Sequence, residues 1–584
     1  MKMEKVMALI LQEMWSFRKI MLAFSILLLI NIQALPAVVA DGNTKKELLS
    51  ELIRLNDERI PEVLSRQWTQ KGHRYYGAVY DHDSVVSPGA TSGLIQYLMS
   101  GYVSKESKYY KSKEILQHMT MAAEGLVNLQ HEDGTIDLLS TNFHSTPDLG
   151  FTIYPLALSY QMMLQHKELG YGEFPEIIKQ YLLNAGRALS VGGIHTPNHR
   201  WVVSGALAWL DSFFPNTAYQ SRVDQWLAEK IDIDPDGQYH ERSTSVYTPI
   251  TNRSLLVMAQ KMGHEELYEI IRKNLDMTFY FVRSTGEIAT ESSRRQDKYV
   301  QSDMSNYYLA YNYLALLDKD SRYAGMVKYI EETVPVEHLS YMLPYLLTDK
   351  QLMKPLVDGE PLPTNYHKYF KYSDMVRIRR DEVDMSIITD NPIFLTYFKG
   401  EAALEAVRLS SAFFGKGQFR SQQMEKVDEN TYKLTSTIYG PYYQPLPEEK
   451  IPQEGEAWGQ VSRAEREQSE IQELTVTVTV SENNGKVSVT INIDGPDNLP
   501  VTLELGFREG GELSNVIPKQ RIDQAYMAIP GEFTIYKYGT DQIKVGPGVV
   551  HHNWTQLRGA LPKLQAESVY FTNYAPCEFK FTLE

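Results

Sequence analysis

The spacing of apolar residues changes near Pro361–Pro363, and this change constrains the fold more than any other feature. From about residue 44 to 357 apolar side chains recur every three or four residues, a spacing typical of amphipathic helices. Beyond Pro363 apolar and polar residues alternate, as in Met375–Arg380 and Lys486–Ile493. Alternation of this kind predicts strands with one buried face. The chain is therefore expected to be helical first and β second.

The helical part contains about a dozen segments separated by short breaks such as Asp234–Gly237. Short breaks make consecutive helices antiparallel neighbours, which form either a solenoid or a double-layered α/α toroid. A solenoid is disfavoured because no clean repeat of about 30–45 residues is visible. We therefore predict an incomplete double helical toroid over residues 41–357, with a cleft built from loops and helix starts.

Residues 358–584 are predicted to form an antiparallel β-sandwich. Thr475–Val480 and Val501–Leu505 also alternate, and Gly and Pro turns recur between such segments. The stretch from about 441 to 468 is rich in Pro, Glu and Gln. We expect it to be a long excursion between strands, with a flap over a cleft as an alternative.

Residues 1–40 are typical of a signal peptide. Arg18–Lys19 precedes the apolar run Ile20–Ile32, and Val38–Ala40 offers small residues for cleavage. We expect a mature start near Asp41 and a secreted protein, or a periplasmic one in a bacterium with two membranes. A retained membrane anchor is the alternative, although the run is short for a span of about 20 residues.

Composition excludes some functions. With 43% hydrophobic and 22% charged residues the chain is globular. A net charge of −15 argues against a nucleic-acid partner. One cysteine, Cys577, excludes an intramolecular disulfide. The 38 tyrosines against 20 phenylalanines suit a sugar-binding cleft, because a phenol ring can stack on a pyranose while its hydroxyl donates outward.

Two polar segments lie near predicted helix starts. The first is His195–Trp201, and the second, about fifty residues later, is Tyr239–Tyr247. They combine an amide, imidazoles, guanidinium groups and phenols. β-Elimination at a uronate needs such groups, since its carboxylate must be neutralised, a base must take the C5 proton and an acid must protonate the leaving oxygen.

The motif Asn198-His199, followed by the turn Asp236-Gly237 and by Glu241-x-Ser243-x-x-x-Tyr247, resembles the α/α-toroid polysaccharide lyases, which include heparinase II/III-, alginate- and hyaluronate-lyase-like enzymes. The resemblance implies a toroid before an antiparallel sandwich, with an acidic polysaccharide or oligosaccharide between them. It also implies a product with a 4,5-unsaturated uronate at its new non-reducing end.

The resemblance also implies roles for four residues. Asn198 would neutralise the carboxylate, and His199 would be the base or a second neutralising group. Tyr247 would be the acid, or both base and acid, with Tyr239 as the alternative phenol. A plain structural alternative is that Asn198 caps its helix and His199 is an exposed first-turn residue.

Seven further residues are candidates for substrate binding, and a surface ion pair or a helix cap is the alternative for several of them. These candidates are His144, Arg200, Trp201, Arg242, Arg253, Arg294 and Arg295.

No cofactor or metal is predicted. Some lyases of this kind carry a histidine and zinc in the sandwich, but this chain offers only His367 before Met375–Arg380. The pair His551-His552 would point to opposite faces of a strand.

Two other functions remain open. One is a non-catalytic exported glycan-binding protein, and the other is a toroid glycoside hydrolase that uses two carboxylates. The candidate carboxylates are Asp133, Asp137, Asp148, Asp211, Asp236 and Glu241.

Overall fold

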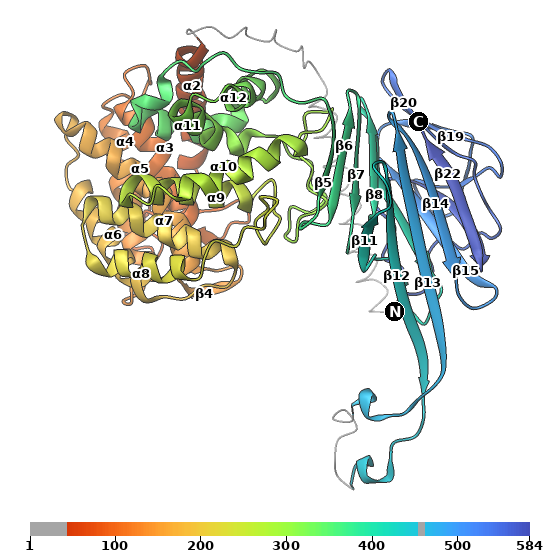
Figure 1. Ribbon diagram of the computed structural model, residues 1–584. Helices are drawn as coiled ribbons and strands as arrows, with labels where there is room; N and C mark the ends of the chain where they lie inside the picture. The colour runs from red at the N-terminus through yellow and green to blue at the C-terminus, as the bar shows by residue number, and fades with distance from the viewer. Residues whose placement is uncertain (1–43, 454–461) are drawn as a thin grey trace, which may run out of the picture. The chain divides into compact units, whose positions relative to one another are not determined.

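The computed structural model describes residues 44–453 and 462–584. The predicted signal peptide at 1–40 lies outside these residues. Helices occupy the first part of the described chain and strands the second, as the change in apolar spacing predicts (Figure 1). The fold class is thereby confirmed.

The helices are arranged in two layers. Helices α3, α5, α7 and α9 pack side by side as an inner layer, and α13 packs on α3 and α5. Helices α4, α6, α8 and α10 pack on the outside of these. The bounds are α2 Thr44–Leu64, α3 Pro88–Val103, α4 Lys113–Leu129, α5 Thr146–Gln165, α6 Phe174–Val191, α7 Pro197–Phe213, α8 Thr217–Ala228, α9 Tyr247–Met262, α10 Leu267–Thr278, α11 Tyr308–Asp318, α12 Ser321–Thr333 and α13 Leu343–Thr348.

Burial explains the two layers. Inner helix α7 is buried on nearly every side from Asn198 to Asp211, whereas outer helix α6 buries one stripe that includes Ile178, Leu182, Ala185 and Leu189. A stripe of this spacing covers one neighbouring surface, and all-round burial needs neighbours on both sides. This is the double-layered arrangement of an α/α toroid.

Two short hairpins extend from the helical layers. Strands β1 (Val79–Tyr80) and β2 (Val86–Ser87) precede α3, and β3 (Ile136–Leu138) and β4 (Asn142–Ser145) precede α5. The last helical turn ends at Met353 and the first sandwich strand begins at Asn365.

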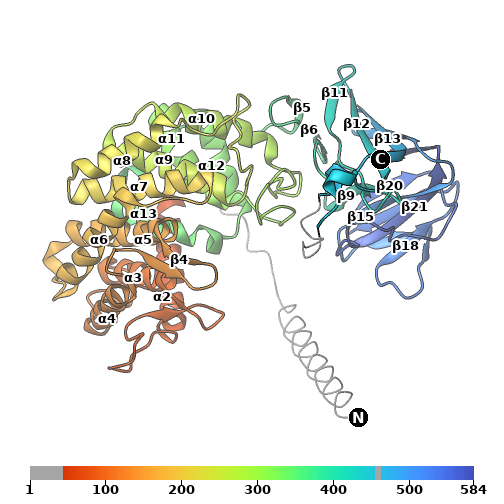
Figure 2. The ribbon, with the colours of Figure 1, turned by 90° about the horizontal axis from the view of Figure 1, so that it is seen from below.

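The β part consists of two stacked sheets (Figure 2). Both contribute to one core, in which Ile378 and Leu503 of the first sheet pack with Val478 and Phe581 of the second. Strand pairs are antiparallel except for β18 with β21. The first sheet comprises β5 Asn365–Phe370, β6 Met375–Arg380, β7 Val383–Ile388, β8 Leu395–Lys399, β9 Ala402–Ser411, β10 Gly417–Gln418, β15 Leu499–Phe507, β17 Val516–Pro518, β18 Ala525–Ala528 and β21 Glu567–Ala575.

The second sheet carries the long hairpin of β12 and β13, and the Pro- and Glu-rich stretch joins these two strands. Residues 454–461 of that stretch lie outside the described residues. The strands are β11 Gln423–Lys426, β12 Thr431–Tyr443, β13 Gln468–Asn483, β14 Lys486–Asp494, β16 Glu512–Ser514, β19 Thr534–Tyr538, β20 Asp541–Gly546 and β22 Cys577–Leu583. Within the described ranges, no helix has the length and apolarity needed to cross a membrane.

Candidate functional site

The starts of three inner helices meet at one place. The Thr146 hydroxyl at the start of α5 donates to the Gly193 carbonyl, just ahead of α7. Asn198 at the start of α7 donates to Glu241, six residues before α9. The two polar segments that lie about fifty residues apart in sequence are therefore in direct contact.

Asn198 is the second residue of α7 and is 2% exposed. Its Nδ2 donates to Thr196 Oγ1 at 3.0 Å and to Glu241 Oε2 at 2.7 Å. Thr196 occupies the cap position, so the capping alternative for Asn198 is wrong. An amide that is buried beside a carboxyl group is suited to binding a second carboxyl group from a ligand.

His199 is half-buried beside Asn198. Burial lowers its pKa from 6.5 to about 4, against a smaller raising effect of Asp148, while His195 and Arg295 lower it further. Its Nδ1 accepts the backbone N–H of His195 at 3.4 Å. The neutral imidazole therefore carries its proton on Nε2 and is a hydrogen-bond donor there.

Tyr247 is the first residue of α9 and is half-buried. Its backbone N–H donates to Ser243 Oγ, which holds the start of the helix. Its phenol oxygen accepts a hydrogen bond from Gln296 Nε2 at 2.6 Å, and the Arg295 guanidinium lies 5.1 Å from its ring centre. A phenolate at this position would face a cation.

Arg295 lies between the Tyr247 ring and Glu241, the carboxyl group that accepts from Asn198. Its Nε lies 3.7 Å from Glu241 Oε1, too long for a hydrogen bond, and has no hydrogen-bond partner. The next residue, Asp297, fixes the segment that carries Arg295 and Gln296. Its carboxylate is 3% exposed and accepts hydrogen bonds from the hydroxyls of Ser245 and Ser293. Arg295 was predicted from the sequence, whereas Gln296 and Asp297 were missed because nothing in their spacing marks them.

The structure overturns the predicted roles of three residues. Trp201 is 0% exposed and its indole N–H donates to Asp232, so it cannot stack on a sugar. The Arg200 guanidinium is buried against Trp201 and is paired with Glu229 and Asp232, so it cannot bind a substrate.

The third correction concerns Tyr239. It is 3% exposed and its hydroxyl donates to Asn252 inside the core. Burial raises its pKa well above the ordinary value. A phenol that lies inside the core cannot reach a glycosidic bond, so Tyr239 is not an alternative to Tyr247.

A group of cations lies around Arg294, the neighbour of Arg295 in the chain. Arg294 is exposed, and Arg242 donates to the carbonyl of Ser373 in the β5–β6 turn. Burial, together with the neighbouring Arg294, lowers the pKa of Arg242. Burial also lowers the pKa of Lys298, with Arg420 as the next cause. Neither Lys298 nor Arg420 was predicted. Arg420 comes from the sandwich and is far from the motif in sequence.

Arg253 lines a cavity, and His144 contacts a residue that lines another. His144 in β4 has a φ of +49°, bonds to Asp133 at 2.9 Å and stacks on His131. His131 lines a cavity of about 310 Å³. Arg253 and Val246 line another cavity, of about 490 Å³. The Arg253 guanidinium lies 4.8 Å from the Tyr154 ring centre.

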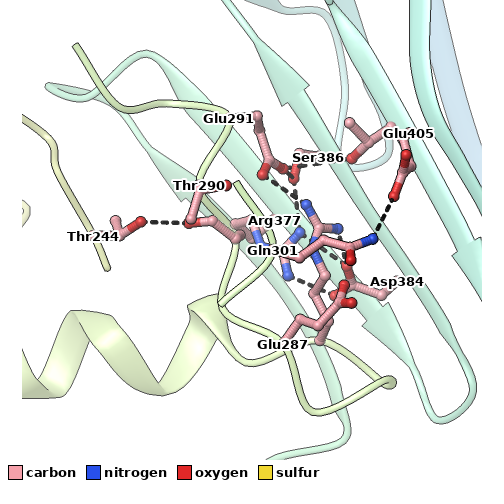
Figure 3. Close-up of polar contacts among 12 residues, drawn as sticks. Thr244, Glu287, Thr290, Glu291, Gln301, Arg377, Asp384, Ser386 and Glu405 are labelled. Carbon is pink, nitrogen blue, oxygen red and sulfur yellow. Dashed lines mark hydrogen bonds and ion pairs between the residues drawn. The ribbon is translucent and has the colours of Figure 1, made fainter. Parts of the chain in front are cut away.

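A buried ion network joins the segment before Arg294 to the sandwich (Figure 3). Arg283 donates to Glu291 at 2.6 Å and to Asp384 of β7 at 2.9 Å. Arg377 of β6 donates to Asp384 at 2.6 Å, and Ser386 donates to Glu291. Burial is complete or nearly so for all of these, so the network holds the segment on the sheet.

Arg283 and Glu291 of this network also line a cavity of about 430 Å³. The residues around it include Arg283, Glu291, Tyr299, Phe398, Glu405 and Arg508. In the described part of the chain no group of three or more His, Cys, Asp or Glu side chains is arranged to hold a metal ion.

The likeness of this chain to known proteins is one of fold. The sequence matches no protein-family model and no curated protein. Solved structures do match. The chondroitin AC lyase of Streptomyces coelicolor A3, solved with chondroitin sulphate, is 12% identical with a TM-score of 0.53, over 92% of this chain and 79% of that one.

Two other lyases are similar. Heparinase III is 11% identical with a TM-score of 0.55, over 95% of this chain and 86% of that one. A xanthan lyase of Paenibacillus is 8% identical with a TM-score of 0.57, over 92% of this chain but 57% of that one. At such identities the likeness concerns the fold. The chain therefore has the fold of the α/α-toroid polysaccharide lyases, a helical toroid followed by a β-sandwich.

Proposed function

We propose that the protein is an exported polysaccharide lyase that cleaves a uronic-acid-containing glycan by β-elimination and leaves a 4,5-unsaturated uronyl end. One observation carries this proposal: the Asn198 amide, the Arg295 guanidinium and the Tyr247 ring form one chain of neighbours at the starts of α7 and α9, in which Glu241 joins Asn198 to Arg295. The toroid-and-sandwich fold supports it.

The substrate carboxylate would bind to Asn198 and Arg295. Both groups donate hydrogen bonds, and Arg295 also supplies a positive charge where negative charge develops during elimination. Neutralising the carboxylate makes the neighbouring C5–H acidic. Arg242, Arg294 and Lys298 would hold further acidic groups of the polymer.

Tyr247 is the best candidate for both proton transfers. His199, with a pKa of about 4, is a weak proton acceptor, and its Nε2–H suits it to bind the carboxylate instead. A Tyr247 phenolate would take the C5 proton, the C4–O bond would break as the C4=C5 bond forms, and the phenol would return the proton to the departing oxygen.

A glycoside hydrolase is the second candidate, because Glu241 is a buried carboxyl group whose pKa is raised by burial. Hydrolysis needs such a group as its general acid. Two of the other candidate carboxylates are less suited. Asp211 lies at the far end of α7 and accepts from Asn216 and Gln220, and Asp236 accepts from the Tyr372 and Ser373 backbone.

One assay separates these functions. The purified mature protein is incubated with a panel of uronate-containing glycans while ultraviolet absorbance of the unsaturated product and new reducing ends are followed. The lyase produces both signals together. Reducing ends without absorbance would favour hydrolysis, and binding without either signal would favour a non-catalytic glycan-binding protein.

Export is part of the proposal. We expect secretion, or release into the periplasm, with cleavage near Asp41, no membrane attachment of the mature chain and no nucleic-acid partner. N-terminal sequencing of the protein from the medium or periplasm tests this. An uncleaved chain in the membrane fraction would favour the retained anchor.

A further inference from the structure

Glu241 is a buried carboxyl group that the proposed elimination does not use. It is 6% exposed and accepts from Asn198 Nδ2 at 2.7 Å. The charged groups that face it are Arg295, whose Nε lies 3.7 Å from Oε1, and the carboxylates Asp232 and Asp297. Burial raises the pKa of Glu241, and the two aspartates add to this, whereas Asn198 and Arg295 act against it.

Two buried oxygen atoms in this contact have no hydrogen-bond partner: Glu241 Oε1 and Asn198 Oδ1. Buried polar atoms are normally hydrogen-bonded, so a missing donor is a specific signal. An ionised carboxylate only accepts and cannot satisfy the Asn198 oxygen. A carboxylic acid has one donor and one acceptor, which match the acceptor and donor of an amide.

We propose that Glu241 is a neutral carboxylic acid that pairs with the Asn198 side chain through two hydrogen bonds, and that this pairing reserves the Arg295 charge for a ligand carboxylate. The proposal rests on the proposed lyase function. Glu241 is a positioning residue in this scheme: it orients the amide and does not touch the substrate.

The charge of Arg295 is the reason that the protonation state matters. An ionised Glu241 carboxylate would neutralise the positive charge of Arg295 and repel an acidic sugar. A neutral Glu241 leaves the charge of the partly exposed Arg295 guanidinium, whose Nε has no hydrogen-bond partner, available to the ligand. The second N–H of Asn198, which donates to Thr196, is released when the ligand displaces that hydroxyl. Affinity for an acidic sugar therefore falls as pH rises through the pKa of Glu241.

The first experiment needs no activity. Infrared difference spectra of the unliganded protein are recorded against pH for wild type, Glu241→Gln and Asp211→Asn, a control carboxyl group at the other end of α7. Burial also raises the pKa of Glu331 and Asp236, so those groups contribute to a protonated-carboxyl carbonyl band in every variant. We expect this band above pH 4.5, the ordinary glutamate value, to be equally strong in wild type and Asp211→Asn and weaker in Glu241→Gln. Equal band intensity in all three proteins would overturn the proposal.

The second experiment is the pH dependence of KM for a uronate oligosaccharide. We expect KM of wild type and Asp211→Asn to rise about tenfold per pH unit above the pKa of Glu241, because one proton must be bound for the ligand to bind. Glu241→Gln, which mimics the neutral acid, should lose this dependence. A Glu241→Gln profile that rises as in wild type would contradict the proposal.

The two proposals fail separately. If no glycan gives ultraviolet absorbance, the lyase function fails, while the infrared band still reports the state of Glu241. If Glu241→Gln does not fold, carbon-13 NMR of the glutamate side chains of the wild-type protein replaces the variant. Burial also raises the pKa of Glu331, so the same spectra are recorded for Glu331→Gln. A buried glutamate signal that titrates above pH 4.5 and remains in Glu331→Gln supports the proposal, and its absence overturns it.

Discussion

The side-chain amide of Gln296 donates a hydrogen bond to the phenol oxygen of Tyr247 at 2.6 Å. A tyrosine hydroxyl both accepts and donates, so this bond occupies a lone pair and leaves the phenol proton for another oxygen. Gln296 thereby fixes the direction in which Tyr247 can give a proton, which is what a general acid requires.

Replacing Tyr247 with Phe removes the hydroxyl and keeps the ring. We expect kcat to fall about 10²–10⁴-fold, the usual contribution of an acid–base group, with KM within about threefold. Steady-state ultraviolet assays measure both. The matched control is Tyr239→Phe, which should keep kcat and lose about 1 kcal/mol of unfolding free energy, because its hydroxyl only bonds Asn252. An active Tyr247→Phe with an inactive Tyr239→Phe would reverse the assignment.

Replacing Asn198 with Ala removes the buried amide. We expect kcat to fall about 10²–10³-fold, as for other donors to developing negative charge. Asn216→Ala is the control, since Asn216 caps α8 and should cost about 1 kcal/mol of stability without changing kcat. Equal kinetics of the two variants would remove Asn198 from the site.

Replacing Arg295 with Ala removes the cation beside Tyr247 and Glu241. We expect KM for an acidic oligosaccharide to rise about tenfold or more, because a hydrogen bond to a charged group contributes about 1.5–3 kcal/mol. Arg322→Ala, which breaks an exposed ion pair, should leave KM unchanged. Added salt should raise the KM of wild type more than that of Arg295→Ala. Equal salt dependence would contradict this role.

His199 makes stability depend on pH. Its pKa is about 4 in the folded chain and 6.5 ordinarily, so the unfolded chain binds the proton more tightly. The free energy of unfolding should therefore decrease as pH falls from 6.5 toward 4. Urea unfolding at several pH values measures the slope. His199→Gln, which stays neutral, should show a smaller decrease over that window, and an unchanged slope would contradict the burial argument.

Asp384 holds two buried guanidinium groups, Arg283 and Arg377. Asp384→Ala leaves both without this partner, so the free energy of unfolding should fall by about 3–5 kcal/mol. The matched control is Asp318→Ala. Asp318 accepts two hydrogen bonds from Arg272 in a partly exposed ion pair, so its loss should lower the free energy of unfolding by less than about 1 kcal/mol. Urea denaturation compares them. Equal losses would show that burial of the network adds nothing.

The motif was readable from the sequence because it depends on local positions. Asn198 and Tyr247 lie in the first turns of their helices, as the motif implied, and the strand Met375–Arg380 has the predicted bounds. The partners of Tyr247 could be predicted only in part. Arg295 was a candidate because it is one of a pair of arginines, whereas no sequence pattern indicated Gln296. Lys298 and Arg420 reach the same region only through folding.

The sequence by itself determined the order of helices and strands, because apolar spacing is a local property that each segment expresses without its neighbours. Only the tertiary structure decided which polar side chains meet a ligand. Trp201 and Tyr239 lie in the two motif segments, yet packing of the inner helices buries both of them. The same packing places Glu241 within hydrogen-bond distance of Asn198. Burial depends on contacts between segments far apart in the chain, and residue type and spacing do not encode those contacts.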